Sequence, residues 1–105
     1  MTGAAYNLGI IEEFRANAGR VGGPWAGNTL ILLHDIGARS GIEHVTPLGC
    51  FPQGDGRYVV VASNGGSPTH PAWFHNLKAH PSTQIEVGAV KPRRTFFPWI
   101  PRTLT

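Results

Sequence analysis

The sequence predicts a mainly β fold of the α+β class, with an antiparallel sheet curled into a small barrel whose ends are covered by two helices. Three observations support this. Apolar runs are short and rich in β-branched residues, and two segments have helical periodicity. The 14 glycines and 9 prolines are spread between the runs without a repeat, which favours tight turns between short strands in a single domain.

Four segments are predicted as strands: residues 29–36, 42–51, 57–63 and 83–88. The first is a continuous apolar run, as in a buried strand, and the last alternates apolar with polar residues. Pro47 places the second strand at a sheet edge or a bulge, because proline donates no hydrogen bond to a ladder. Asp55 and Gly56 form a strong turn signal, so residues 52–56 are expected to be a hairpin loop.

Two segments are predicted as helices. Apolar side chains recur at three- and four-residue spacing in residues 7–18, with charged residues between them, and glycines end the segment. Residues 71–80 follow a glycine-rich loop, and Pro71 is expected at the first helical position with Thr69 or His70 as the cap. The order of elements is therefore helix, three strands, helix and strand.

Charge and cysteine content limit the class of protein. The net charge of +3 and pI near 9.6 fit an anionic small ligand as well as nucleic acid, and no lysine- or arginine-rich block marks a nucleic-acid arm. Cys50 is a lone cysteine and allows no intrachain disulfide. The first 14 residues lack the basic and apolar regions of a signal peptide, and no apolar run approaches about 20 residues. We expect a soluble, cytoplasmic protein.

Two loops are candidates for ligand binding. Residues 64–67 expose backbone amides next to a helix N-terminus, which allows a flat ligand to approach closely. Taken alone, this loop is better explained as a strand-to-helix connection. Residues 37–41 place Arg39 and Ser40 in a glycine-flanked turn that could bind phosphate by charge and hydroxyl. A solvated hairpin turn is the better explanation of that segment when nothing else is considered.

No catalytic residue or metal site is predicted. His70, His75 and His80 are spaced by five residues, about 140° per step on a helix, so they do not share a face. Cys50 is interpreted as a small core residue, since no base can be named for it. The residues thus offer a cradle without acid–base machinery, which suits a protein that holds a cofactor and lets the cofactor do the chemistry.

These motifs, taken in order, resemble a known family. The stretches FRANAGRVGGPWAG, LLHDIGARSG, TPL, RYVVVASNGGSPTHPAWFHNLKAHP and IEVG are similar to the deazaflavin-dependent nitroreductase family. The resemblance covers residues 8–89. It implies a split β-barrel of the FMN-binding type, with coenzyme F-420 as the cofactor and FMN as the less favoured one. It also implies hydride transfer to a quinone, a nitroaromatic or another small activated acceptor.

The resemblance assigns cofactor-binding roles to five groups of residues. They are Ala38, Arg39 and Ser40 at the phosphate; His44; Thr46, Pro47 and Leu48 along the ring and ribityl chain; Ala62, Ser63, Asn64, Gly65 and Gly66 along the ring; and Trp73 and Asn76 closing the site. His44 and Asn64 depart from the family, which commonly has Arg and Lys there. Lower phosphate affinity, or affinity that depends on pH, would follow.

The C-terminal segment also departs from the family. Relatives usually continue past IEVG with a strand, a helix and a final strand, whereas residues 90–105 form an atypical, proline-rich tail. We therefore expect a barrel incomplete at the C-terminus, from a truncated or frame-shifted reading frame. The alternative function is a catalytically impaired relative that acts only as a cofactor binder or interaction module. A nucleic-acid-binding barrel is disfavoured, because the aromatics lie on a predicted helix and not on one strand face. Expected partners are the acceptor, a membrane surface reached through a quinone, and a second copy in a homodimer.

Overall fold

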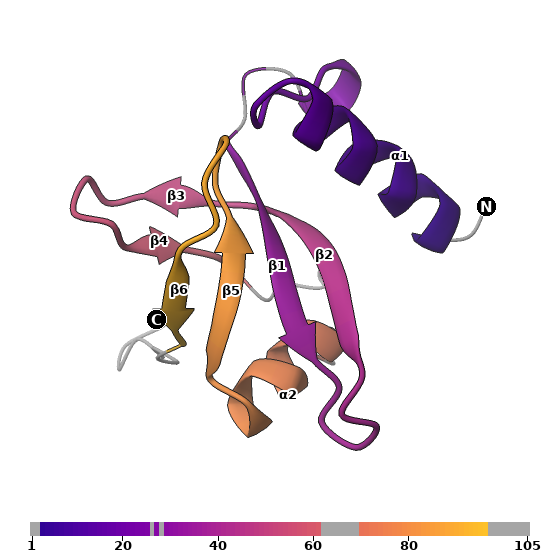
Figure 1. Ribbon diagram of the computed structural model, residues 1–105, viewed down its shortest axis with the longest axis vertical. Helices are drawn as coiled ribbons and strands as arrows, with labels where there is room; N and C mark the ends of the chain where they lie inside the picture. The colour runs from indigo at the N-terminus through magenta and orange to yellow at the C-terminus, as the bar shows by residue number, and fades with distance from the viewer. Residues whose placement is uncertain (1–2, 26, 28, 62–69, 97–105) are drawn as a thin grey trace, which may run out of the picture.

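The computed structural model describes residues 3–25, 27, 29–61 and 70–96, which form a mainly β chain with antiparallel sheets and two α-helices (Figure 1). This coarse prediction is confirmed. The elements in chain order are α1 (Gly3–Ala16), the 3-10 turn η1 (Gly23–Trp25), β1 (Leu30–Ile36), β2 (Glu43–Gly49), β3 (Phe51–Pro52), β4 (Tyr58–Val59), α2 (Ala72–Ala79), β5 (Ser82–Glu86) and β6 (Arg93–Thr95).

The strands form two ladders within the described residues. A four-stranded antiparallel sheet has the order β2-β1-β5-β6, and β3 pairs with β4 in a separate two-stranded ribbon. Leu33 of β1 is the register partner of Thr46 on one side and of Ile85 on the other. Register partners in antiparallel strands point to the same face, so this register decides which side chains meet.

Each face of β1 carries its own apolar cluster. On one face, Ile31 and Leu33 pack with residues that include two from α2; the buried members are Ile31, Leu33, Cys50, Trp73, Leu77 and Ile85. On the other, α1 supplies the partners; the buried members are Ile10, Ile11, Phe14, Leu30 and Leu32. In Figure 1, α1 and α2 lie at opposite ends of the view with the sheet between them. Burial on both faces explains why β1 reads as a continuous apolar run.

The first helix differs from its predicted bounds of 7–18. It starts at Gly3 and ends at Ala16. The helix cannot continue to residue 18, because Ala18 and Gly19 take positive φ values of 53° and 96°. A Cβ on Gly19 would lie 2.9 Å from the Cα of Gly88, a contact that real Cβ atoms essentially never make. Glycine at position 19 therefore lets the chain leave the helix against the segment that follows β5.

The predicted second strand, 42–51, is divided. β2 ends at Gly49, and the backbone amide of Cys50 donates a 2.9 Å hydrogen bond to the Thr29 carbonyl, next to the last register pair of β1 and β2. Phe51 and Pro52 then pair with β4 as the separate strand β3. Pro47 lies inside β2, which is an edge strand of the described sheet, as its missing donor requires. β4 is shorter than the predicted 57–63, whose last two residues lie outside the described residues.

The C-terminal half of the described chain also differs in detail. Pro71 is the N-cap of α2 and not its first residue, since its ψ of 159° is extended. The predicted cap Thr69 lies outside the described residues. β5 spans Ser82–Glu86 in place of 83–88, and the proline-rich segment contributes the short strand β6. Backbone hydrogen bonds just before and just after β6 attach it to β5. The Ile85 N–H donates to the Pro92 carbonyl at 3.0 Å, and the Phe96 N–H donates to the Pro81 carbonyl at 2.8 Å.

Candidate functional site

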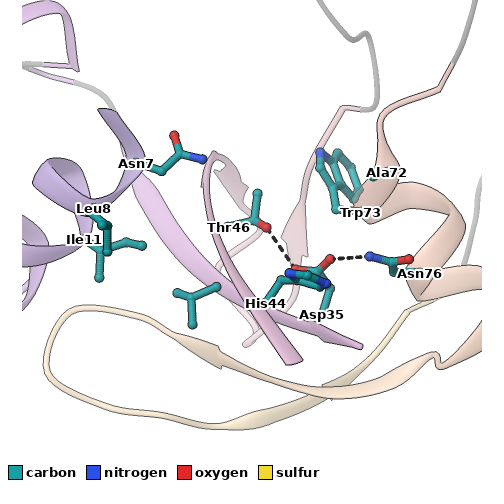
Figure 2. A pocket seen from close by; sticks show the side chains of 10 residues that line it. Asn7, Leu8, Ile11, Asp35, His44, Thr46, Ala72, Trp73 and Asn76 are labelled. Atoms are coloured by element: carbon teal, nitrogen blue, oxygen red, sulfur yellow. Dashed lines mark hydrogen bonds between the residues drawn. The ribbon is translucent and has the colours of Figure 1, made fainter. Parts of the chain in front are cut away.

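A pocket of about 530 Å³ lies at the β2 edge of the sheet, between the two helices. We call it the edge pocket. In Figure 2, Asn7, Leu8 and Ile11 approach it from α1, and Ala72, Trp73 and Asn76 approach it from α2. Strand residues form the wall between the helices; they are Asp35, His44, Val45 and Thr46.

A hydrogen-bonded chain centred on Asp35 forms the polar part of this wall. The Asp35 side chain belongs to a residue that is only 2% exposed. Thr46 Oγ1 donates to its Oδ1 at 2.9 Å, and Asn76 Nδ2 donates to its Oδ2 at 2.7 Å. Asn76 Oδ1 in turn accepts the Ala38 N–H at 2.9 Å. This Asp35 network (Ala38, Asn76, Asp35 and Thr46) ties β1, β2, α2 and the β1–β2 turn together.

The network follows from strand geometry and from the cost of burying charge. Asp35 and His44 are register partners, and Thr46 is two residues further along β2, so all three side chains share the α2 face of the sheet. A buried carboxylate needs hydrogen-bond donors to offset its lost hydration. Thr46 and Asn76 supply one donor to each oxygen, which fixes the orientation of both side chains.

The turn at residues 37–41 borders the pocket through its backbone. Gly37 N–H donates to the Ile42 carbonyl at 2.8 Å, and the Ile42 N–H donates to Ser40 Oγ at 3.1 Å. A Cβ on Gly37 would collide with Ser40 Oγ and lie 3.5 Å from His44 Nε2, so the turn packs closely on itself and on His44. Arg39 and Ser40 are exposed at its tip. The predicted phosphate turn thus lies next to the edge pocket.

The structure brings together five of the residues assigned from the sequence. His44, Thr46, Trp73 and Asn76 line the edge pocket, and Ala38 is bonded to Asn76. Two other assigned residues do not line the pocket. Pro47 is the register partner of Leu32 on the α1 face, and Leu48 packs against the apolar cluster on the α2 face. Ala62, Ser63, Asn64, Gly65 and Gly66 lie outside the described residues, so their roles remain predictions.

Sequence reasoning missed six residues of the edge pocket: Asn7, Leu8, Ile11, Asp35, Val45 and Ala72. One of them had a usable signal. Asp35 is a carboxylate inside an otherwise apolar strand, and charged residues are almost never fully buried unless they are paired. The α1 residues had no comparable signal, because helical periodicity shows that a face is buried without showing what covers it.

A second polar cluster lies on the α1 face, where Arg15 of α1 meets Glu86 of β5. Arg15 Nη2 lies 2.6 Å from Glu86 Oε2, and His34 lies between Glu86 (Nε2 to Oε2, 2.7 Å) and Glu43 (Nδ1 to Oε2, 3.2 Å). The hydrogen bond from Arg15 lowers the pKa of Glu86 from 4.5 to about 2, with a smaller contribution from His34, although burial acts in the opposite direction. The Arg15–Glu86 pair fixes α1 to the sheet.

Three further observations concern the rest of the described chain. Burial raises the pKa of the Cys50 thiol, which suits a core residue. Nowhere in 3–25, 29–61 or 70–96 do three His, Cys, Asp or Glu side chains gather as they would around a metal ion. Neither of the described α-helices is long and apolar enough to cross a membrane. A second pocket, of about 740 Å³, lies at the C-terminal end of α1 and is lined partly by Gly19, Arg20 and Gly88.

Comparison with known proteins places these features in a family. The family model described as F420H(2)-dependent quinone reductase matches residues 10–96. The chain is 44% identical over 77 residues to the F420H(2)-dependent quinone reductase Rv1261c of Mycobacterium tuberculosis, covering 71% of this chain and 50% of that protein. The chain therefore spans about half the length of the curated relatives it matches.

Two solved structures share the fold. One, described as an F420-H2 dependent reductase (FDR-A), is 36% identical with a TM-score of 0.54 and covers 60% of this chain and 54% of that chain. The other, described as a domain-swapped dimer, is 30% identical with a TM-score of 0.58 and covers 90% of this chain and 70% of that chain.

Proposed function

The chain belongs to the F420H(2)-dependent quinone reductase family, and from this we propose that it binds reduced coenzyme F-420 and passes a hydride from it to a quinone. The observation that carries the proposal is the edge pocket. Residues assigned to the cofactor from β2 and from α2 meet there, around Asp35. The turn with Arg39 and Ser40 borders the same pocket through the bond between Ala38 and Asn76.

The residues of the pocket fit a deazaflavin. The pocket volume of about 530 Å³ lies within the range usual for cofactor and small-molecule sites. Trp73 supplies a flat apolar surface that is largely buried, and Thr46 and Asn76 supply polar atoms beside it. Flat rings with polar edges bind to walls of this mixed character.

Each part of the site then has a distinct task. The exposed Arg39 guanidinium and the Ser40 hydroxyl would bind the cofactor phosphate, since both can donate hydrogen bonds to phosphate oxygens. Trp73 would cover the ring, and Leu8 and Ile11 of α1 would exclude water from the acceptor side. When bound, the reduced deazaflavin supplies the hydride; the protein's own contribution is to hold and orient it.

The finer parts of the proposal rest on the resemblance and on the neighbours. The loop at residues 62–66 would complete the ring site, and the sheets would belong to a split β-barrel of the FMN-binding type. Nitroaromatics are a second class of acceptor. The domain-swapped neighbour supports a homodimer. The protein would work in the cytoplasm, and a quinone acceptor would bring it into contact with a membrane surface.

The proposal is tested by binding and by turnover. Oxidised F-420 is titrated into the protein and its fluorescence followed, and oxidation of reduced F-420 is then measured with menadione and with a nitroaromatic. Micromolar binding with menadione reduction supports the full proposal. Binding without turnover of either acceptor favours the alternative, a cofactor binder or interaction module. Binding of FMN in place of F-420 contradicts the cofactor assignment.

A further inference from the structure

We propose that Asp35 is a positioning residue: by orienting Thr46 and Asn76, it makes the wall of the edge pocket bind an uncharged ligand group that carries a hydrogen-bond donor beside an acceptor. The imide edge of a deazaflavin and the hydroxyls of its ribityl chain both have this chemistry. The inference rests on the proposed function and adds to it which part of the ligand meets which part of the site.

The orientation of Asn76 is set from both ends. The backbone N–H of Ala38 can only donate, so the Asn76 atom 2.9 Å away must be the carbonyl oxygen Oδ1. The amide nitrogen Nδ2 must then face Asp35, at 2.7 Å from Oδ2. An amide nitrogen carries two hydrogens, and the bond to Asp35 uses one of them. Asn76 therefore brings a donor to the pocket it lines.

The orientation of Thr46 is set by Asp35 alone. Carboxylate oxygens accept hydrogen bonds, and Thr46 Oγ1 and Asn76 Nδ2 donate one to each oxygen of Asp35. The hydroxyl hydrogen of Thr46 consequently points to Asp35, which leaves the oxygen lone pairs as acceptors. His44, the register partner of Asp35 on β2, is the other titratable residue of this wall.

The part of this wall formed by Asp35 and Thr46 is unsuited to phosphate. A phosphate offers mainly acceptor oxygens and negative charge, and it would meet the Thr46 acceptor beside the buried carboxylate of Asp35. The adjoining turn has the opposite character, because it exposes the Arg39 guanidinium and the Ser40 hydroxyl. The two surfaces meet where Ala38 bonds to Asn76. The geometry therefore orients the ligand, with its neutral polar part at the wall and its phosphate at the turn.

The test uses three ligands and a double-mutant cycle. F-420, the deazaflavin nucleoside that lacks the phosphate tail, and inorganic phosphate are each titrated into the full chain. Asp35→Asn keeps the side-chain shape but cannot accept from both neighbours, and Thr46→Val removes the acceptor. Each should weaken nucleoside binding about tenfold. Because Asp35 acts in part through Thr46, the nucleoside affinity of the double variant should fall by much less than the hundredfold expected if the two sites were independent.

Controls separate positioning from general damage. Thr46→Ser keeps the hydroxyl and should recover most of the nucleoside affinity that Thr46→Val loses. Asp55→Asn, in the exposed β3–β4 loop, should leave nucleoside affinity unchanged. Phosphate affinity should be unchanged in every variant. In the free protein, the two Nδ2 hydrogens of Asn76 should differ clearly in chemical shift, because one of them is bonded to Asp35. This difference in chemical shift should become smaller in Asp35→Asn.

The outcomes distinguish the inference from the function on which it rests. Failure of the wild type to bind F-420 and the nucleoside overturns both. Wild-type binding with unchanged affinity in Asp35→Asn, or fully additive losses in the double variant, overturns the positioning role and leaves the proposed function standing. If Asp35→Asn does not fold, the inference is tested by comparing nucleoside affinity in Thr46→Val and Thr46→Ser. Equal nucleoside affinity in these two variants overturns the inference.

Discussion

Asp35 and Asn76 are 41 residues apart in the sequence and belong to β1 and α2, yet Asn76 Nδ2 donates a 2.7 Å hydrogen bond to Asp35 Oδ2. The bond positions the second helix on the sheet at the point where the edge pocket opens. Because Asn76 also accepts from the Ala38 backbone, one side chain joins the pocket wall to the neighbouring turn. The first prediction concerns this residue.

Asn76→Ala removes both bonds and leaves the Asp35 carboxylate with Thr46 as its remaining side-chain partner among the described residues. We expect the free energy of unfolding to fall by about 1–3 kcal/mol, because a buried acceptor loses a donor. Affinity for F-420 should fall about tenfold. Urea unfolding and fluorescence titration measure the two effects. Asn17→Ala, at the exposed end of α1, is the control; equal effects from both substitutions would contradict the account.

Gly37→Ala tests the close packing of the turn. Its new Cβ would collide with Ser40 Oγ, so the hydroxyl must rotate away and give up its bond to the Ile42 N–H. We expect a loss of about 1 kcal/mol in the free energy of unfolding. Gly9→Ala is the matched control. Nothing lies within 4 Å of its added Cβ inside α1, so it should stabilise by roughly 0.5–1 kcal/mol.

A double variant checks the cause assigned to the Gly37 effect. In Ser40→Ala the obstructing hydroxyl is absent, so adding Gly37→Ala should cost little more than Ser40→Ala alone. Chemical denaturation of the four proteins gives the coupling free energy. Additive costs would show that the turn resists a Cβ for some other reason.

Stability should depend on pH through Glu86. Its pKa is about 2 in the folded chain and 4.5 when unperturbed, so its contribution is complete above about pH 4.5 and is lost as the pH falls toward 2. The difference corresponds to at most about 3 kcal/mol. Glu86→Gln should therefore be less stable at pH 6 and should show a flatter stability profile between pH 4.5 and 2. The exposed Glu12→Gln is the control, and a profile unchanged in Glu86→Gln would remove Glu86 from this role.

Arg39→Ala tests the phosphate turn. If its guanidinium pairs with phosphate, F-420 affinity should fall by about 1.5–3 kcal/mol, or roughly ten- to a hundredfold. Affinity for the deazaflavin without its phosphate tail should be unchanged. Raising the salt concentration should reduce the difference in F-420 affinity between Arg39→Ala and the wild type, because salt screens the charge of the guanidinium. Arg57→Ala, in the exposed β3–β4 loop, is the control. An unchanged F-420 affinity in Arg39→Ala would remove the turn from the site.

Local periodicity explains what could be predicted. Residues two apart on a strand share a face, which places His44 with Thr46, and residues three apart on a helix are neighbours, which places Trp73 with Asn76. The apolar stripe of the first helix was predicted for the same reason, and Ile10, Ile11 and Phe14 are buried as that pattern requires. The resemblance then supplied the expectation that the strand pair and the helix pair belong to one site.

The remainder depends on long-range packing, which periodicity does not encode. The part played by α1 in the edge pocket arises from its placement on the β1–β2 side of the sheet, so Asn7 and Leu8 could not be foreseen. The break between β2 and β3 arises because Phe51 and Pro52 pair with β4 in a separate ribbon and not with β1. Strand β6 forms on residues near prolines because β5 offers it an unpaired edge.

Mapping F-420 binding by backbone and side-chain amide NMR shows whether the cofactor occupies the edge pocket. We expect shifts at Ala38, Ser40 and Thr46, at the Trp73 indole and at the Asn76 side chain, all saturating with one affinity. Shifts confined to Gly19, Arg20 and Gly88, which line the second pocket at the end of α1, would exclude the edge pocket as the cofactor site.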